Sequence, residues 1–299
     1  MAKIFYIFLI LLVNFASAAM LSLRYRYLFS FLGHNISRTS SFIILSITNS
    51  LNYLIPFKVG LLVGGPLAPK IKEKISIYKG SVVFAFGQLF EIIWQLIFIL
   101  IAILFAGNKF FKNDFLFNLI FAGVVCFFLL YLICRPAKIL NVLIRFYGFF
   151  PEKLKKLIRS TGIKRDKTNN IFKDLKTLFT KKKFLLKYSL RTVTYAFFTP
   201  LNLFLILLAF SSYITYINIF MIFWTSFILG KLSGLPGGIG IRDVTIGALL
   251  VKFGIPTALT LKIVFLHRIL SLFPLLPVGL IWLLYFSKGK MKHFYKQYF

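Results

Sequence analysis

The chain has 299 residues, of which 59% are hydrophobic and 15% are charged, whereas about a quarter of the residues in a soluble domain are charged. It carries 37 Lys and Arg against 7 Asp and Glu, a formal charge of +30. In a soluble protein this excess would favour nucleic-acid binding, but here the basic residues lie mainly between apolar runs, as in the cytoplasmic loops of membrane proteins. We therefore expect an anionic lipid surface, and no nucleic acid, as the partner of these charges.

The apolar segments predict an all-α polytopic membrane protein with a single transmembrane domain over residues 1–299. A membrane span needs about 20 apolar residues. Backbone groups inside lipid must be satisfied within the structure, and no strand-like alternation is visible, so we expect helices. The segments fall at about 4–23, 42–65, 81–106, 115–134, 187–210, 214–235, 241–255 and 261–286.

The first apolar segment allows two interpretations. Lys3 and the apolar run that follows it, with the small residues Ala16, Ser17 and Ala18, resemble a secretory signal peptide. We favour an uncleaved first span, because the positive n-region is a single Lys and further spans follow.

The domain divides into a first half (1–134), a basic loop (135–186), a second half (187–286) and a basic tail (287–299). The loop carries 15 Lys and Arg, so we expect loop and C-terminus on the cytoplasmic side of the cell membrane. Over 151–179, apolar residues alternate with Lys, which suits either amphipathic helices on an anionic surface or an ordinary solvated loop. The loop is also where a soluble partner would dock.

Two apolar segments are interrupted by Pro and Gly. In 42–65 the break lies at Pro56 and Gly60, and basic residues flank both ends, so we expect a re-entrant hairpin. The second break is a run that no continuous helix favours, consisting of Pro236, Gly237, Gly238 and Gly240.

The two breaks share a Pro-x-x-x-Gly core, offset by 180 residues, and the same offset aligns Gln88 with Arg268. The charge pattern predicts that segment 81–106 runs outward and segment 261–286 runs inward. Opposite directions are typical of an inverted repeat with a binding site near the midplane. We therefore predict a helix bundle in which two re-entrant segments are related by an inverted repeat.

Polar residues at membrane depth are candidates for substrate binding, because a charge there costs about 2.5–3.5 kcal/mol. Glu91 is a carboxylate inside an unbroken span, and we expect Arg242 or Arg268 as its partner. Arg242 and Asp243 also allow a simpler interpretation, as a local pair at a helix start. The candidate residues are Arg242, Arg268, Asp243, Glu91, Lys231 and Gln88.

The expected chemistry is recognition rather than catalysis. Half-helix N-termini after Pro56 and Gly240 would present free N–H groups, which together with Arg242 and Arg268 suit a lipid phosphate. The sequence has neither a Gly-x-x-x-x-Gly-Lys-[Ser/Thr] motif nor a His-Glu-x-x-His motif, and its seven acids are scattered. We therefore expect no catalytic residue, no metal and no cofactor.

The motif around the second break resembles a known family. It matches the pattern Pro-Gly-Gly-x-Gly-x-Arg-[Glu/Asp]…Gly-[Val/Ile]-Pro…Arg of the lysylphosphatidylglycerol synthase transmembrane-domain family, also called UPF0104. The N-terminal part is similar too, at Leu23–Arg26, Asn49, Asn52, Pro56 and Gly60. The residues that carry the resemblance near the second break are Pro236–Asp243, Gly254, Ile255, Pro256, His267 and Arg268.

The resemblance implies a flippase-like domain. In bifunctional members this domain moves an aminoacylated phospholipid between leaflets, and a separate soluble domain makes that lipid from aminoacyl-tRNA. The sequence ends at Phe299, so we expect neither that soluble domain nor lipid aminoacylation here. The first half departs from the family pattern, since 61–66 lacks Arg and Gln88 stands where Arg is frequent, which weakens the transfer of substrate contacts to that half.

The main functional hypothesis is therefore a lipid flippase. Arg242 and Arg268 would contact the phosphate of a headgroup near the midplane, and Glu91 and Asp243 would pair with them or with a cationic headgroup. The alternative is a membrane enzyme or accessory subunit in lipid-linked sugar or glycolipid synthesis. A third hypothesis is a scaffold that transports nothing and docks a soluble partner on loop 135–186.

Overall fold

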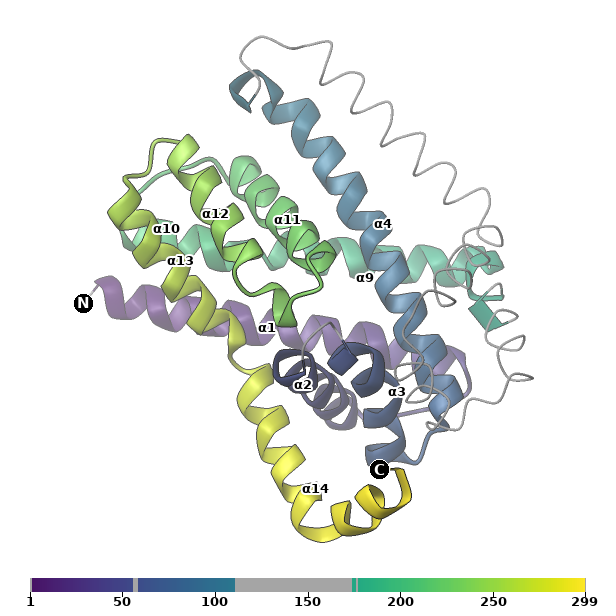
Figure 1. Ribbon diagram of the computed structural model, residues 1–299. Helices are drawn as coiled ribbons and strands as arrows, with labels where there is room; N and C mark the ends of the chain where they lie inside the picture. The colour runs from purple at the N-terminus through teal and green to yellow at the C-terminus, as the bar shows by residue number, and fades with distance from the viewer. Residues whose placement is uncertain (1, 56–58, 111–173, 176, 299) are drawn as a thin grey trace.

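The computed structural model describes residues 2–55, 59–110, 174–175 and 177–298, and every element within them is helical (Figure 1). Three helical stretches are long and apolar enough to cross a membrane, and a bent helix pair adds a fourth. The prediction of an all-α polytopic membrane protein is thus confirmed. The elements are α1 (Ala2–Phe31), α2 (Arg38–Leu54), α3 (Val59–Glu73), α4 (Ile77–Phe110), α9 (Lys182–Phe198), α10 (Leu201–Ala209), α11 (Tyr216–Leu232), the 3₁₀ turn η1 (Pro236–Gly238), α12 (Ile241–Lys252), α13 (Thr257–Leu272) and α14 (Leu275–Tyr298).

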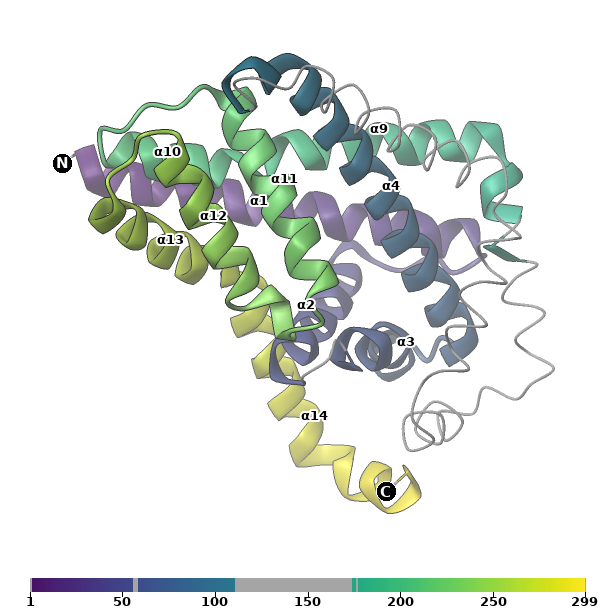
Figure 2. The same cartoon turned by 45° about the horizontal axis from the view of Figure 1, so that its top comes forward.

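Helix α1 lies antiparallel to α9 and α10 along most of its length (Figures 1 and 2). Near one end the rings of Tyr27 and Phe184 stack at 5.3 Å, and further along, Asn202 donates a hydrogen bond of 2.8 Å to Asn14. The helix continues through Ser17 and buries it. This packing favours the interpretation of the first segment as a span.

Helices α2 and α3 form the first hairpin. The Ser37 hydroxyl caps α2 by accepting the Ser40 N–H at 3.0 Å, and the Thr48 hydroxyl of α2 donates to the Gly64 carbonyl of α3 at 3.3 Å. A side chain at Gly60 would overlap the backbone carbonyl of Leu51, so this glycine permits the close approach of the two helices. Pro56 lies outside the described residues. The re-entrant course of the hairpin in a membrane stays a prediction.

Helices α11 and α12, joined through η1, form the second hairpin. Gly237 in η1 has φ of 55°, a left-handed conformation, and a side chain there would overlap the ring of Tyr53 at the end of α2. The tip of the second hairpin therefore touches the first hairpin beside its own break.

Each hairpin packs on a long helix from the other half of the chain. Helix α2 lies antiparallel on α14, where the Ser50 hydroxyl donates to the Leu276 carbonyl at 3.1 Å. Helix α11 lies antiparallel on α4, where Phe98 and Phe220 meet edge to face at 5.4 Å. An inverted repeat would require this reciprocal arrangement. The repeat itself stays a prediction.

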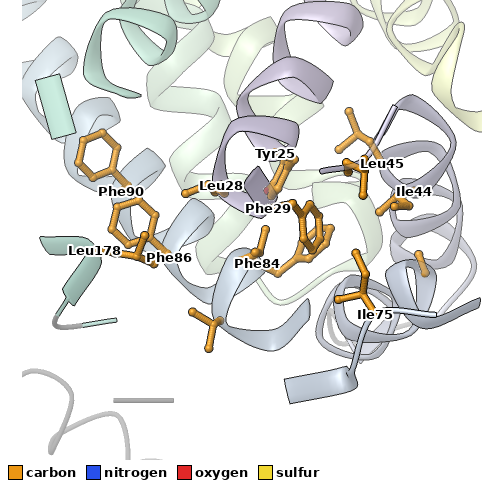
Figure 3. Close-up of a cluster of buried hydrophobic side chains, with 14 of the residues drawn as sticks. Tyr25, Leu28, Phe29, Ile44, Leu45, Ile75, Phe84, Phe86, Phe90 and Leu178 are labelled. Atoms are coloured by element: carbon orange, nitrogen blue, oxygen red, sulfur yellow. The ribbon is translucent and has the colours of Figure 1, made fainter. Parts of the chain in front are cut away.

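The largest buried apolar cluster lies between α1, α2 and α4 (Figure 3). Leu175 and Leu178, from the end of the basic loop, belong to this core. Asp174 next to them accepts hydrogen bonds from Tyr78 and Lys79 at 2.7 and 2.8 Å. Leu175 and Leu178 are thus core residues. The interpretation of 151–179 as amphipathic helices would place them on a membrane surface instead.

One expected segment differs in shape. Residues 261–286 were expected as one run, but the structure has two helices, α13 and α14, with a bend of 42° at Phe273-Pro274. Proline lacks the N–H that would continue a helix, which accounts for the break. Segment 115–134 and loop residues 135–173 lie outside the described part of the chain.

Candidate functional site

The site is built where η1 meets α2, α12 and α13. Arg268 of α13 donates from Nη1 to the Gly237 carbonyl at 3.3 Å, and the same atom lies 3.8 Å from Oδ1 of Asp243. Its guanidinium lies 5.4 Å from the centre of the Tyr53 ring. Arg268 therefore connects the tip of the second hairpin to the first hairpin.

Arg242 is the second residue of α12, and its side chain is buried. Its guanidinium carbon lies 5.0 Å from the ring centres of both Phe223 and Phe227 on α11. Its Nε has no hydrogen-bond partner within the described structure. The cation is thus held by aromatic faces, which attract it weakly and leave its hydrogen-bonding capacity partly unused.

The N-terminus of α12 is not as open as the sequence suggested. Oδ2 of Asp243 accepts the Gly240 N–H at 3.1 Å. This donor, expected to be free for a ligand, is satisfied internally by an acidic residue in the first turn of the helix. The positive charge near this helix end comes from the two arginine side chains.

Glu91 of α4 pairs with Lys231 of α11 at 3.2 Å, and it accepts a second bond from Gln95 at 2.9 Å. The prediction that Arg242 or Arg268 pairs with Glu91 is therefore wrong. The antiparallel packing of α4 on α11 places Glu91 opposite Lys231, whereas Arg268 lies beside the nearer carboxylate of Asp243. Lys231, which the sequence analysis names as a substrate-binding candidate, thus forms an ion pair with Glu91.

Gln88 lies almost one helical turn before Glu91 on α4 and donates a hydrogen bond of 3.2 Å to the Tyr25 hydroxyl. The structure thus places it beside α1, away from Arg268, with which the repeat alignment equates it. Gln88 therefore borders the cluster as an uncharged residue.

Arg24 of α1 is a member of the site that the sequence analysis missed. It is only 1% exposed, donates from Nη2 to the Tyr188 hydroxyl at 3.3 Å, and has two further nitrogens without a partner among the described residues. Glu91 lies within electrostatic range of it. The missed signal is the apolar stretch from Tyr27 to Leu32, which shows that α1 continues beyond Arg26.

His267 is buried next to Arg268, with its ring edge to face on Phe223 at 6.0 Å. Neither ring nitrogen has a hydrogen-bond partner in the structure described. The described residues contain no group of His, Cys, Asp and Glu that could hold a metal ion.

These residues form one continuous arrangement, which we call the central cluster, because the Phe227 ring lies 5.0 Å from both Lys231 and Arg242. In the described part of the chain it contains more cations than carboxylates, and all three guanidinium groups keep unpartnered nitrogens. Arginines that are buried or partly buried and keep free N–H donors can bind an anion. Its charged members are Arg24, Lys231, Arg242 and Arg268 against Glu91 and Asp243.

A sequence profile of the lysylphosphatidylglycerol synthase TM region matches residues 2–279, and therefore includes the whole central cluster. The chain belongs to this family. The resemblance seen around the second break is thus confirmed, and it extends over nearly all of the chain. Membership in the lysylphosphatidylglycerol synthase TM region family makes this a lipid-related membrane domain.

One relative of the chain is a UPF0104 membrane protein of Methanothermobacter thermautotrophicus, 35% identical over 81 residues. The matched stretch is 27% of this chain and 24% of the relative, so it spans about a quarter of the relative's length. No solved structure matches the chain.

Proposed function

We propose that this protein is a lipid flippase, which moves a phosphate-bearing lipid between leaflets with its headgroup at the central cluster. The observation that carries the proposal is the excess of cations over carboxylates in the central cluster, where all four cations are buried or partly buried. A cation in a membrane interior costs about 2.5–3.5 kcal/mol, which favours an anion that can neutralise it. Planar guanidinium groups suit phosphate oxygens in particular.

The arrangement of the hairpins supports movement as well as binding. Arg268 bonds to the tip of one hairpin and lies over Tyr53 of the other, so it contacts both halves of the chain. In transporters built from inverted repeats, rocking of one half against the other exposes a central site to each side in turn. The sequence carries no P-loop motif, so the proposed movement is passive or gradient-driven.

The proposed orientation follows the charge distribution. Loop 135–186 and the basic tail would lie in the cytoplasm, and the protein would reside in the cell membrane. A soluble partner on the loop, and the re-entrant course of both hairpins, belong to the same proposal.

The test is lipid movement in vesicles that contain the purified chain. The vesicles contain phosphatidylglycerol with a fluorescent label, and added dithionite reduces the label in the outer leaflet only. Loss of the fluorescence that the inner leaflet protects therefore reports movement. Arg242→Gln removes the charge but keeps a polar side chain, and it should slow movement by about 10- to 100-fold, as expected for a lost hydrogen bond to a charged group.

Lys262→Gln is the matched control, because this cation is exposed on α13, outside the central cluster. It should leave movement unchanged. Equal rates for wild type and Arg242→Gln, with equal amounts of inserted protein, would falsify the proposal. Mass spectrometry of the recovered lipid separates movement from the enzymatic alternative, which requires a chemically altered product.

A further inference from the structure

A second basic feature lies between the C-terminal end of α1 and the middle of α9, apart from the central cluster. A hollow there is lined by Arg26, Tyr27, Ser30, Asn35 and Arg191, among others. Arg24 and Arg26 are two residues apart on α1, and positions with this spacing point to different sides of a helix. Arg24 is buried against Tyr188, whereas Arg26 faces this hollow.

Both arginines of the hollow keep most of their hydrogen-bond donors. Arg26 donates from Nε to the Ile36 carbonyl at 2.8 Å, and Arg191 lies 4.9 Å from the centre of the Tyr27 ring. A guanidinium has five N–H donors. In the described structure neither arginine forms an ion pair, so both retain unneutralised charge at the hollow.

The neighbouring surface of α9 is apolar. Leu190, next to Arg191, is 69% exposed, and Phe197, two turns further along α9 and away from the end of α1, is 49% exposed. In a membrane protein such a face contacts acyl chains. Arg26 lies five residues before the end of α1, about 8 Å along the helix, which is a depth from which arginine reaches the headgroup layer.

We propose that this hollow binds the phosphate of an anionic phospholipid headgroup, while the acyl chains lie along Leu190 and Phe197. Arg26 and Arg191 would contact the phosphate from two helices, and Ser30 and Asn35 offer hydroxyl and amide groups to the rest of the headgroup. Basic pockets between transmembrane helices bind anionic headgroups in this manner. This site is independent of transport through the central cluster.

The test is native mass spectrometry of the full chain, released from nanodiscs of phosphatidylcholine with increasing phosphatidylglycerol. The wild-type chain should retain phosphatidylglycerol in preference to phosphatidylcholine. The double variant Arg26→Gln/Arg191→Gln should weaken this retention by about fivefold for each cation removed. Lys262→Gln, which removes one exposed cation elsewhere, should behave as wild type.

Two further measurements decide the ligand and the place. Inorganic phosphate at millimolar concentration should not displace the lipid, because phosphate has no acyl chains to contact α9. Displacement would assign the hollow to soluble phosphate and overturn the lipid proposal. Adding Arg242→Gln to the double variant should lower retention further, because the hollow and the central cluster are separate sites; no further loss would assign both effects to one site and overturn the proposal. Equal retention by the double variant and the wild type would also overturn the proposal.

Discussion

The two broken hairpins have a similar shape but are fixed to the opposite half of the chain by different interactions. The second hairpin is fixed to α4 by the partly buried ion pair between Lys231 and Glu91. The first is fixed to α14 without an ion pair, by the Ser50 hydroxyl bond and a close backbone contact at Gly279 on the α2 side. On the α3 side, the Lys72 ammonium lies 4.2 Å from the centre of the Trp282 ring.

This difference locates the chemistry of the molecule. The strength of a helix contact without an ion pair changes little when an anion binds nearby. The strength of an ion pair beside arginines with free donors does change, because the anion interacts with the same charges. Under the proposed function, the first hairpin would act as the stable support and the second as the element that responds to a bound headgroup. Three substitutions, from the largest expected effect to the smallest, test this contrast.

Glu91→Gln should have the largest effect on stability. It leaves the Lys231 ammonium buried without its carboxylate, which should lower the free energy of unfolding by about 3 kcal/mol. The measurement is the unfolding midpoint in a detergent titration. Lys231→Met in the same chain should restore most of the loss, and a double variant as unstable as Glu91→Gln would show that the ion pair is not the cause.

Gly279→Ala tests the uncharged contact of the first hairpin. The added methyl group would overlap the Ser46 carbonyl and the Ser50 hydroxyl, so α14 must shift away from α2 at a cost of about 1–3 kcal/mol. The same unfolding titration measures it.

Gly247→Ala is the control for Gly279→Ala. A methyl group there meets Thr260 and Val264 at ordinary contact distances of 3.6 and 3.9 Å. Because Ala favours a helix over Gly, this variant should be neutral or up to about 1 kcal/mol more stable. Equal effects of the two substitutions would contradict the close contact at α14.

Ser50→Ala should have the smallest effect. It removes one hydrogen bond between helices, which in membrane proteins contributes about 0.6 kcal/mol on average. Ser46→Ala is its control, because the Ser46 hydroxyl donates within its own helix, to the Phe42 carbonyl at 2.8 Å. A loss for Ser50→Ala as large as that for Glu91→Gln would erase the contrast between the two hairpins.

The sequence predicted the elements well because membrane helices follow from local composition. Apolar length and the residues at the second break were sufficient to place the hairpins and to select Arg242 and Arg268. Pro274 indicates the bend before α14, because proline lacks the N–H that continues a helix. The pairing of Glu91 with Lys231 could not be derived, since it depends on which distant helices lie side by side.

Arg24 shows a different limit of sequence reasoning. A cation at the end of an apolar run usually marks the membrane boundary, and Arg26 two residues later reinforces that interpretation. Only the continuation of α1 and the presence of Tyr188 on α9 identify Arg24 as an interior residue. Its neighbour Arg26 fits the boundary role, so one short stretch contains both kinds of arginine.

The length of α1 has a consequence for the surrounding bilayer. Its apolar stretch Ile4–Phe31 and the antiparallel stretch Lys182–Ala209 each contain 28 residues, about 42 Å of helix, whereas the hydrocarbon layer is about 30 Å thick. Since the two stretches run side by side, they share this surplus and are expected to tilt together or to thicken the lipid around them. A thinner membrane would increase the tilt of both stretches from the bilayer normal. Bilayer thickness would therefore change how α1, α9 and α10 are oriented.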